Sequence, residues 1–225
     1  MDDRLATWTA AGAPGPEALT GRRVELQPLQ AARHAADLFA AAHGRDADPH
    51  LWDHMAYGPF PDAAALAAWA REREDGEDPR FYAVVDRVTG RAGGVVSLMR
   101  VDCANGCIEI GNVWFGAALQ RTPQATEAIA LLARHAFDDL GHRRLEWKCD
   151  AANARSRAAA LRLGFTYEGT FRQHMIVKGR NRDTAWFAIV DGDWPAVKAA
   201  LEAWLDPANF DARGRQRASL AALRT

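Results

Sequence analysis

The sequence has few cysteines and no long hydrophobic run, and these absences exclude several classes of protein. Its three cysteines, Cys103, Cys107 and Cys149, are too few and odd in number for a disulfide framework, so we expect a reducing compartment. No cluster of Cys and His has the spacing of zinc ligands, and we predict no metal site. The first residues lack the basic and apolar regions of a signal peptide, and no apolar stretch is long enough to span a bilayer. We therefore predict a cytoplasmic protein.

Neither sign of charge dominates the chain. Its 28 Lys and Arg residues nearly balance 29 Asp and Glu residues, which gives a net charge of -1. This balance gives no electrostatic basis for binding nucleic acid or an anionic membrane surface, so we expect neither as a partner. The 225 residues are 48% hydrophobic, which suffices for one well-filled core. We predict an N-terminal arm at 1–20, one domain at 21–206 and a peripheral tail at 207–225.

The pattern of apolar residues predicts a mixed α/β sheet covered by helices. Alternation of polar and apolar residues, or a short apolar run, predicts strands at about 23–29, 81–86, 93–99, 107–115, 144–149, 165–173 and 184–190. Apolar residues at helical spacing predict helices at about 31–42, 62–76, 124–140, 153–163 and 193–205. Because the fourth and fifth of these strands flank a single helix, we expect them to be parallel.

The turn at 120–126 lies between a strand and a helix and has the features of a phosphate site. The N–H groups and the dipole at the start of a helix attract an anion. Thr122 suits the N-cap position and Pro123 the first helical position. The same two residues also fit an ordinary well-capped helix. The turn is not a Walker motif, because no Gly-Lys-Ser/Thr sequence is present.

Four residues near the ends of the two central strands could carry chemistry. Glu109 faces the side of its strand opposite Ile108, and a carboxylate there is costly to bury unless it is ion-paired or used in a reaction. Gly111 indicates a bulge or the close approach of another group. Asn153 and Ser156 share one helix face just beyond a strand end. Asn153 could also be a simple N-cap.

Taken in order and spacing, these segments resemble the GNAT superfamily of acyl-CoA-dependent N-acetyltransferases, and within it the branch of the ribosomal-protein N-terminal acetyltransferases RimJ and RimL. The resemblance covers about residues 19–205 and rests on the segments 109–111, 120–125, 153–156, 159–165 and 178–183. One position departs from the family turn: Pro123 replaces its first glycine and offers no N–H to a phosphate. Ala125 satisfies the second glycine position.

The resemblance implies the GNAT fold, in which the fourth and fifth strands of a twisted mixed sheet splay apart around acetyl-CoA. It implies cofactor contacts from Gly111, Asn112, Val113, Gln120, Arg121, Thr122, Gln124, Ala125, Thr126, Asn153 and Ser156. It also implies direct attack of an amine on the acetyl group, which requires a base because most amines are protonated at pH 7. Glu109 is our candidate for the base. Ser156 is our candidate for the hydroxyl that stabilises the departing thiolate.

The acceptor is predicted less narrowly than the cofactor. We expect a primary amine, either of a small molecule or of a protein N-terminus, with Trp52, Trp114, Trp147, Arg172 and His174 as candidate contacts. Each of the three tryptophans could equally be a core residue, and the basic run 178–182 could be a solvated hairpin tip.

Three different functions stay open beside this one. The microcin C self-immunity acetyltransferases resemble this branch, which makes the amine of an aminoacyl-nucleotide or a similar toxic compound a second possible acceptor. The chain could also be a non-catalytic acyl-CoA-binding module, or a structural domain that binds no CoA. The sequence also leaves open whether the protein forms a homodimer.

Overall fold

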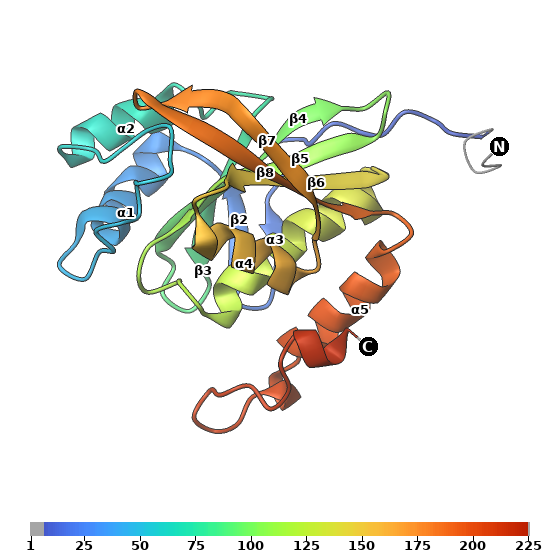
Figure 1. Cartoon of the computed structure of the whole chain (residues 1–225). Coiled ribbons are helices and arrows are strands. Elements are labelled where there is room, and N and C mark those ends of the chain that lie inside the picture. Colours follow the sequence, from blue (N-terminus) through green and yellow to red (C-terminus); the bar gives the residue numbers. More distant parts are fainter. Residues whose placement is uncertain (1–6, 225) are drawn as a thin grey trace.

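The computed structural model describes residues 7–224 and contains an eight-stranded sheet with five α-helices around it (Figure 1). The strands are β1 (Leu19–Thr20), β2 (Val24–Pro28), β3 (Arg80–Asp86), β4 (Ala92–Asp102), β5 (Cys107–Phe115), β6 (Arg144–Asp150), β7 (Thr166–Val177) and β8 (Arg180–Val190). Their order in the sheet is β1-β2-β3-β4-β5-β6-β8-β7. All neighbours are antiparallel except β5 and β6, which confirms the predicted mixed sheet and its parallel centre.

The helices cover the two faces of the sheet unequally (Figure 1). They are α1 (Ala31–His43), α2 (Ala63–Arg71), α3 (Pro123–Arg134), α4 (Ala154–Leu163) and α5 (Trp194–Leu205). The larger core includes apolar residues of α3, α4 and α5 together with Ile108 and Ile110 of β5. A second core joins α1 and α2 to the opposite face of β3 and β4. Since successive strand residues point to opposite faces, Glu109 points away from the larger core.

Capping residues explain where three of the helices begin and where one of them ends. Asp62 accepts a hydrogen bond from Ala65 N (2.8 Å) and starts α2. Thr122 and Asn153 cap α3 and α4 in the same way, as their sequence positions predict. Gly164 ends α4 with a φ of 104°, a left-handed conformation that favours glycine.

Four segments differ from the sequence prediction. The helix predicted to continue to residue 140 changes at His135–Asp139 into a π-helical turn. Strands β7 and β8 reach almost to the hairpin tip at Lys178 and Gly179, so both are longer than predicted. Within the predicted arm, β1 pairs with β2, and Ala11 and Gly12 donate backbone hydrogen bonds to Cys103 O and Leu140 O. Residues 1–6 of that arm lie outside the described part. The tail is not wholly peripheral, because Leu220 is buried in the larger core.

The central strands separate halfway along their length. β5 pairs with β6 from Cys107–Arg144 to Ile110–Trp147 and no further. On its other side, Gly111 of β5 pairs with Ser97 of β4, and Trp114 pairs with Val95. Between these two pairs the chain advances three residues on β5 but only two on β4. This offset is a β-bulge, and Asn112 within it has a φ of 52°. The predicted splay of the fourth and fifth long strands is therefore confirmed, and the bulge bends β5 where the splay begins.

Two properties of the described residues bear on the classes of function. Between residues 7 and 224, every helix is too short or too polar to cross a membrane. The same part of the chain contains no group of three or more His, Cys, Asp and Glu side chains arranged to hold a metal ion.

Candidate active site

The bulge in β5 leaves backbone groups available at the splay. Ser97 Oγ donates to Gly111 O (3.0 Å), and Asn112 Nδ2 donates to Ser97 Oγ (3.0 Å). A Cβ on Gly111 would lie 2.3 Å from Met99 Sδ, so only glycine fits here without displacing that side chain. Beyond Ile110 the β5 backbone has no partner on β6. An extended amide chain could therefore pair with β5 here as a further strand would.

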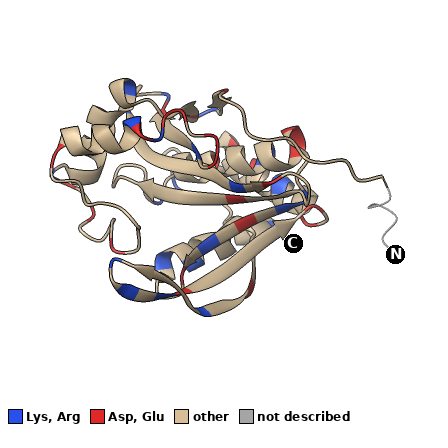
Figure 2. Cartoon of the chain, turned by 90° about the horizontal axis from the view of Figure 1, so that it is seen from above, with Lys and Arg blue, Asp and Glu red and all other residues tan. Residues whose placement is uncertain are grey.

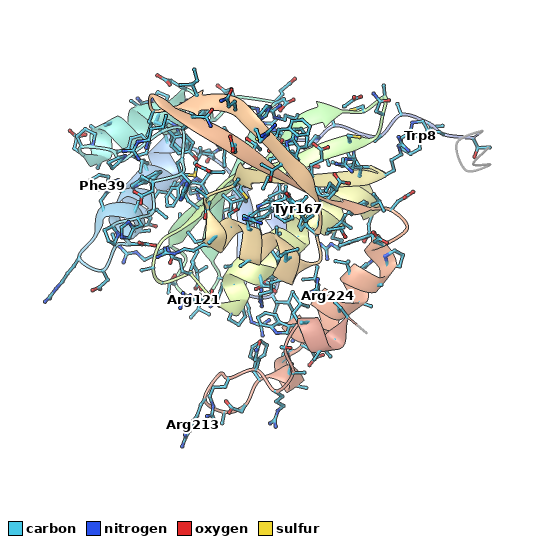
Figure 3. All side chains as sticks on the ribbon, viewed as in Figure 1. Trp8, Phe39, Arg121, Tyr167, Arg213 and Arg224 are labelled. Atoms are coloured by element: carbon cyan, nitrogen blue, oxygen red, sulfur yellow. The ribbon has the colours of Figure 1, made fainter. Side chains whose placement is uncertain are left out.

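The turn before α3 is held together largely by its own groups. Thr122 Oγ1 donates to Leu119 O (2.7 Å) and accepts from Ala125 N (3.3 Å), while Thr126 N donates to Thr122 O (3.4 Å). Gln124 Nε2 donates to Asp86 (3.3 Å) on β3, away from the splay. Arg121 has a φ of 60°, and its exposed side chain lies beside the N-terminal end of α3 (Figure 3). Arg121 is thus the residue of this turn best placed to meet an anion from solvent.

The start of α4 faces the turn across the splay and brings two predicted residues together. Asn153 Oδ1 accepts from Ser156 N (3.0 Å), which makes Asn153 the N-cap that the sequence allowed for. Trp147 Nε1 donates to Ser156 Oγ (3.0 Å). A hydroxyl that accepts one bond keeps its own proton to donate elsewhere. Trp147 therefore fixes the orientation of Ser156, whose hydroxyl also lies within reach of the Cys149 thiol.

Glu109 lies in a dense ionic cluster on the face of the sheet opposite α3, where acidic and basic segments lie side by side on the central strands (Figure 2). Its Oε2 is 3.0 Å from Lys148 Nζ and 3.2 Å from Arg100 Nε, and its side chain is only 7% exposed. Burial raises the pKa of Glu109, although Lys148 and Arg100 oppose that shift. For Glu146, which Lys148 also contacts, burial acts to raise the pKa, but hydrogen bonds from Lys148 and Arg144 outweigh it and lower the pKa. A carboxylate at this position is expected from the sequence to be either ion-paired or used in a reaction, and the surroundings of Glu109 are those of an ion-paired carboxylate.

A cavity of about 830 Å³ lies where the α1–α2 loop, the end of β6 and the β7–β8 hairpin meet. Its lining carries both signs of charge, and its residues are Ala42, His43, Ala47, Asp48, Pro49, Trp52, Asp53, His54, Pro59, Asp150, Ala152, Val177, Lys178, Arg180, Asn181 and Arg182. Lys178 Nζ donates to Trp52 O (3.0 Å), so the hairpin tip is tied to the loop rather than free in solvent. The hairpin and the α2 region lie close together in Figure 1.

Asp48 links this cavity to both sides of the splay. Its carboxylate accepts from Gln120 Nε2 (3.4 Å), in the turn before α3, and pairs with Arg155 of α4. A hydrogen bond from His50 N and the contact with Arg155 lower the pKa of Asp48. Asp48 therefore connects the wall of the cavity to the turn before α3 and to the first turn of α4, the two elements that flank the place where β5 and β6 separate.

The structure also shows a histidine–carboxylate pair that sequence reasoning missed. His54 Nδ1 lies 3.1 Å from Asp150 Oδ2, and both residues line the cavity. The two are 96 positions apart, so spacing could not connect them. The available signal was the position of Asp150 at the carboxyl end of a parallel strand, where polar residues often serve a site. The other cavity histidine, His43, accepts a bond from Phe60 N (3.4 Å), and burial lowers its pKa.

The five residues predicted to contact the acceptor fall in different places. Trp52 lines the cavity, and Trp114 packs beneath it with ring centroids 5.3 Å apart. Trp147 is buried in the larger core against Phe165. Arg172 and His174 are exposed on β7 and outside the cavity lining, and His174 Nδ1 lies 3.0 Å from Thr184 Oγ1.

Comparison with known proteins agrees with this architecture. Residues 23–166 match the model of the acetyltransferase (GNAT) domain. A crystal structure of a GCN5-related N-acetyltransferase from Brucella melitensis is 45% identical in sequence, with a TM-score of 0.94. That similarity covers 97% of this chain and 99% of the other.

Two further relatives carry more specific names. A Bacillus subtilis protein named provisionally as the ribosomal N-acetyltransferase YdaF is 29% identical over 109 residues, which cover 48% of this chain and 59% of that protein. The structure of the Microcin C7 self immunity acetyltransferase MccE, in complex with acetyl-CoA and AMP, is 25% identical with a TM-score of 0.66, over 76% of this chain and 93% of that one. Together with the splayed sheet, the family match settles the class: this chain belongs to the acetyltransferase (GNAT) domain family and is an acyltransferase.

Proposed function

We propose that this protein transfers the acetyl group of acetyl-CoA to a primary amine by direct attack. The observation that carries the proposal is the splay of β5 from β6 beyond Ile110, flanked by the N-terminal ends of α3 and α4. The exposed Arg121 supplies a cation where a pyrophosphate would meet the start of α3. The complex of MccE with acetyl-CoA supports the same cofactor for this fold.

In this proposal, the predicted cofactor residues fall into three groups. Gly111, Asn112 and Val113 offer the unpaired β5 backbone to an extended amide chain, and an N–H of this bulge stabilises the oxyanion. Arg121 contacts phosphate, while Gln120, Thr122, Gln124, Ala125 and Thr126 shape the turn that presents it. Ser156 donates its proton toward the departing thiolate, and Asn153 fixes the position of Ser156.

The cavity favours an acceptor that carries an anionic group near its amine. Lys178, Arg180 and Arg182 line one side, and Asp48 and Asp150 lie among the other lining residues. A carboxylate or phosphate would meet the basic hairpin, and an amine would meet the acidic residues. This arrangement keeps the aminoacyl-nucleotide as a second candidate beside a protein N-terminus. Trp52 offers either acceptor an aromatic surface within the cavity.

The cofactor part is tested by calorimetry of acetyl-CoA with the wild-type protein and Arg121→Ala. We expect binding by the wild type and roughly 10–150-fold weaker binding by the variant, because a charge-assisted contact contributes about 1.5–3 kcal/mol. Arg213→Ala is the matched control, since Arg213 is an exposed arginine on the C-terminal loop, away from α3 (Figure 3). An intact protein that binds no acetyl-CoA would refute the transferase proposal.

The acceptor part is tested by following thiol release. A tripeptide with a free amino terminus and a non-hydrolysable aminoacyl sulfamoyl adenosine represent the two candidates. Faster turnover of the nucleotide analogue, lost in Arg180→Gln, would favour the aminoacyl-nucleotide. Faster turnover of the peptide would favour a protein N-terminus. The cytoplasmic location and a homodimer stay predictions.

A further inference from the structure

His54 and Asp150 form a pair whose orientation is fixed from one side. Asp150 is the last residue of β6, and its Oδ1 accepts from Ala152 N (2.9 Å) while its Oδ2 faces His54. Asn153 N donates to Asp150 O (2.9 Å), so the same turn leads directly into the cap of α4. The side chains of His54 and Asp150 are 33% and 23% exposed. The pair is thus held in place while remaining open to the cavity.

The geometry assigns the proton between these two groups. A carboxylate can only accept, so the shared proton lies on His54 Nδ1 when Asp150 is ionised. The neutral imidazole then carries its lone pair on Nε2, and within residues 7–224 no group hydrogen-bonds to that atom. An imidazole oriented by a carboxylate, with its other nitrogen free, is the arrangement of a general base near neutral pH.

We propose that His54 is the general base of this acetyltransferase and that Asp150 is the residue that positions it, an inference that rests on the proposed function. The amine nitrogen bonds to the thioester carbonyl carbon and gives its proton to His54 Nε2. The C–S bond breaks, and sulfur leaves with the electron pair. The protonated imidazole releases its proton, and through solvent the thiolate gains one, so the products are an amide and the CoA thiol.

The surroundings of His54 suit this role better than those of Glu109. Glu109 is ion-paired with Lys148 and Arg100, and its side chain is only 7% exposed, so its carboxylate is engaged within the cluster and has little access to an amine. His54 shares the cavity with titratable and charged groups from three parts of the fold. From the α1–α2 region, the end of β6 and the β7–β8 hairpin, these groups are His43, Asp48, Asp53, Asp150, Lys178, Arg180 and Arg182.

The first test compares His54→Gln with His50→Gln. His50 Nδ1 also pairs with an aspartate, Asp53, at 2.9 Å on the same loop, but its side chain is 67% exposed and it does not line the cavity. We expect His54→Gln to lower kcat by about 10²–10⁴-fold, the usual contribution of acid–base help, with acetyl-CoA binding unchanged. We expect His50→Gln to match the wild type. The tripeptide and the aminoacyl sulfamoyl adenosine serve as acceptors.

The second test separates chemistry from structure through pH and rescue. In the wild type, activity should fall as pH decreases and His54 gains a proton. The amines of the two acceptors lose their protons at different pH values. A limb of the pH profile that is the same with both acceptors therefore belongs to the enzyme. Asp150→Asn should lower kcat with acetyl-CoA binding unchanged, because the carboxylate that positions the imidazole is gone. Added imidazole should restore part of the activity of His54→Ala.

Two outcomes would overturn the proposal. One is a His54→Gln variant with the kcat and pH profile of the wild type. The other needs no acceptor: if the NMR signals of the His54 ring are the same in Asp150→Asn as in the wild type, the pair does not exist in solution. By contrast, a wild-type protein that binds no acetyl-CoA refutes the proposed function itself, which calorimetry reports separately.

Discussion

Glu109 and Asp150 are carboxylates on the two adjacent parallel strands, and their settings are opposite. Glu109 lies where β5 and β6 are still paired, and two cations lie within 3.2 Å of it in a nearly closed cluster. Asp150 lies at the end of β6, beyond the separation, and shares its carboxylate between one amide and one histidine beside a cavity. The two carboxylates thus differ in their partners and in their access to a ligand.

The largest expected effect comes from removing the cation at the centre of the closed cluster. Lys148→Met leaves Glu109 and Glu146 buried without their shared partner, and losing one member of a buried pair costs about 3–5 kcal/mol. Urea unfolding at pH 7 measures this loss. Lys198→Met is the matched control, since Lys198 pairs with Asp138 in a more exposed setting, where losing the pair should change stability far less.

The same variant should depend on pH in a defined direction. Burial raises the pKa of Glu109 in the folded state, so folding is favoured as pH falls through the window between its unfolded and folded pKa values. Lys148 opposes the raised pKa of Glu109, so without Lys148 this window extends to higher pH. Lys148 also helps to lower the pKa of Glu146, and the stability that this lowered pKa gives the fold at higher pH is lost with it. The stability deficit of Lys148→Met should therefore shrink between pH 7 and pH 5. A deficit independent of pH would contradict the ionic origin.

A smaller effect tests whether Asn153, just beyond the end of β6, only caps α4 or also contacts the cofactor. Asn153→Ala removes the N-cap of α4 and should cost about 1 kcal/mol of stability, whereas Asn153→Asp keeps the capping oxygen and should stay near the wild type. Asp62→Ala removes the equivalent cap of α2 and is the control for stability alone. If Asn153 acts only as a cap, both Asn153 variants should bind acetyl-CoA like the wild type. Weaker binding by Asn153→Ala would show that this side chain contributes to cofactor binding, whereas weaker binding by Asn153→Asp alone would reflect the added negative charge.

Local patterns predicted most of the sheet and the helices. Alternation in β5 and β6, and the capping residues Asp62, Thr122 and Asn153, act within a few positions of the chain, and sequence reasoning detects such signals. The same reasoning failed for β1, which has only two residues, and for the outer part of β7, where most side chains are exposed and no alternation marks a buried face. The π-helical turn after α3 has no local signal that we can identify.

The site was predictable only in part. The resemblance predicted the splay, which the strand pairing confirms, and it pointed to the turn before α3 and the start of α4 because each of these is a contiguous segment. It could not bring together the α1–α2 loop, the end of β6 and the β7–β8 hairpin, whose contacts, such as Lys178 with Trp52 and His54 with Asp150, join distant positions. Trp52 fits both interpretations offered from sequence, since it is buried and also lines the cavity.

The most direct test of the account compares kcat of His54→Gln and Glu109→Gln under conditions in which both variants bind acetyl-CoA like the wild type. Glu109→Gln keeps the shape of the side chain and leaves Lys148 paired with Glu146. The account predicts that His54→Gln loses at least about 100-fold in kcat and that Glu109→Gln loses far less. The reverse order, with Glu109→Gln the more damaged enzyme, would return the base to the closed cluster and contradict the account.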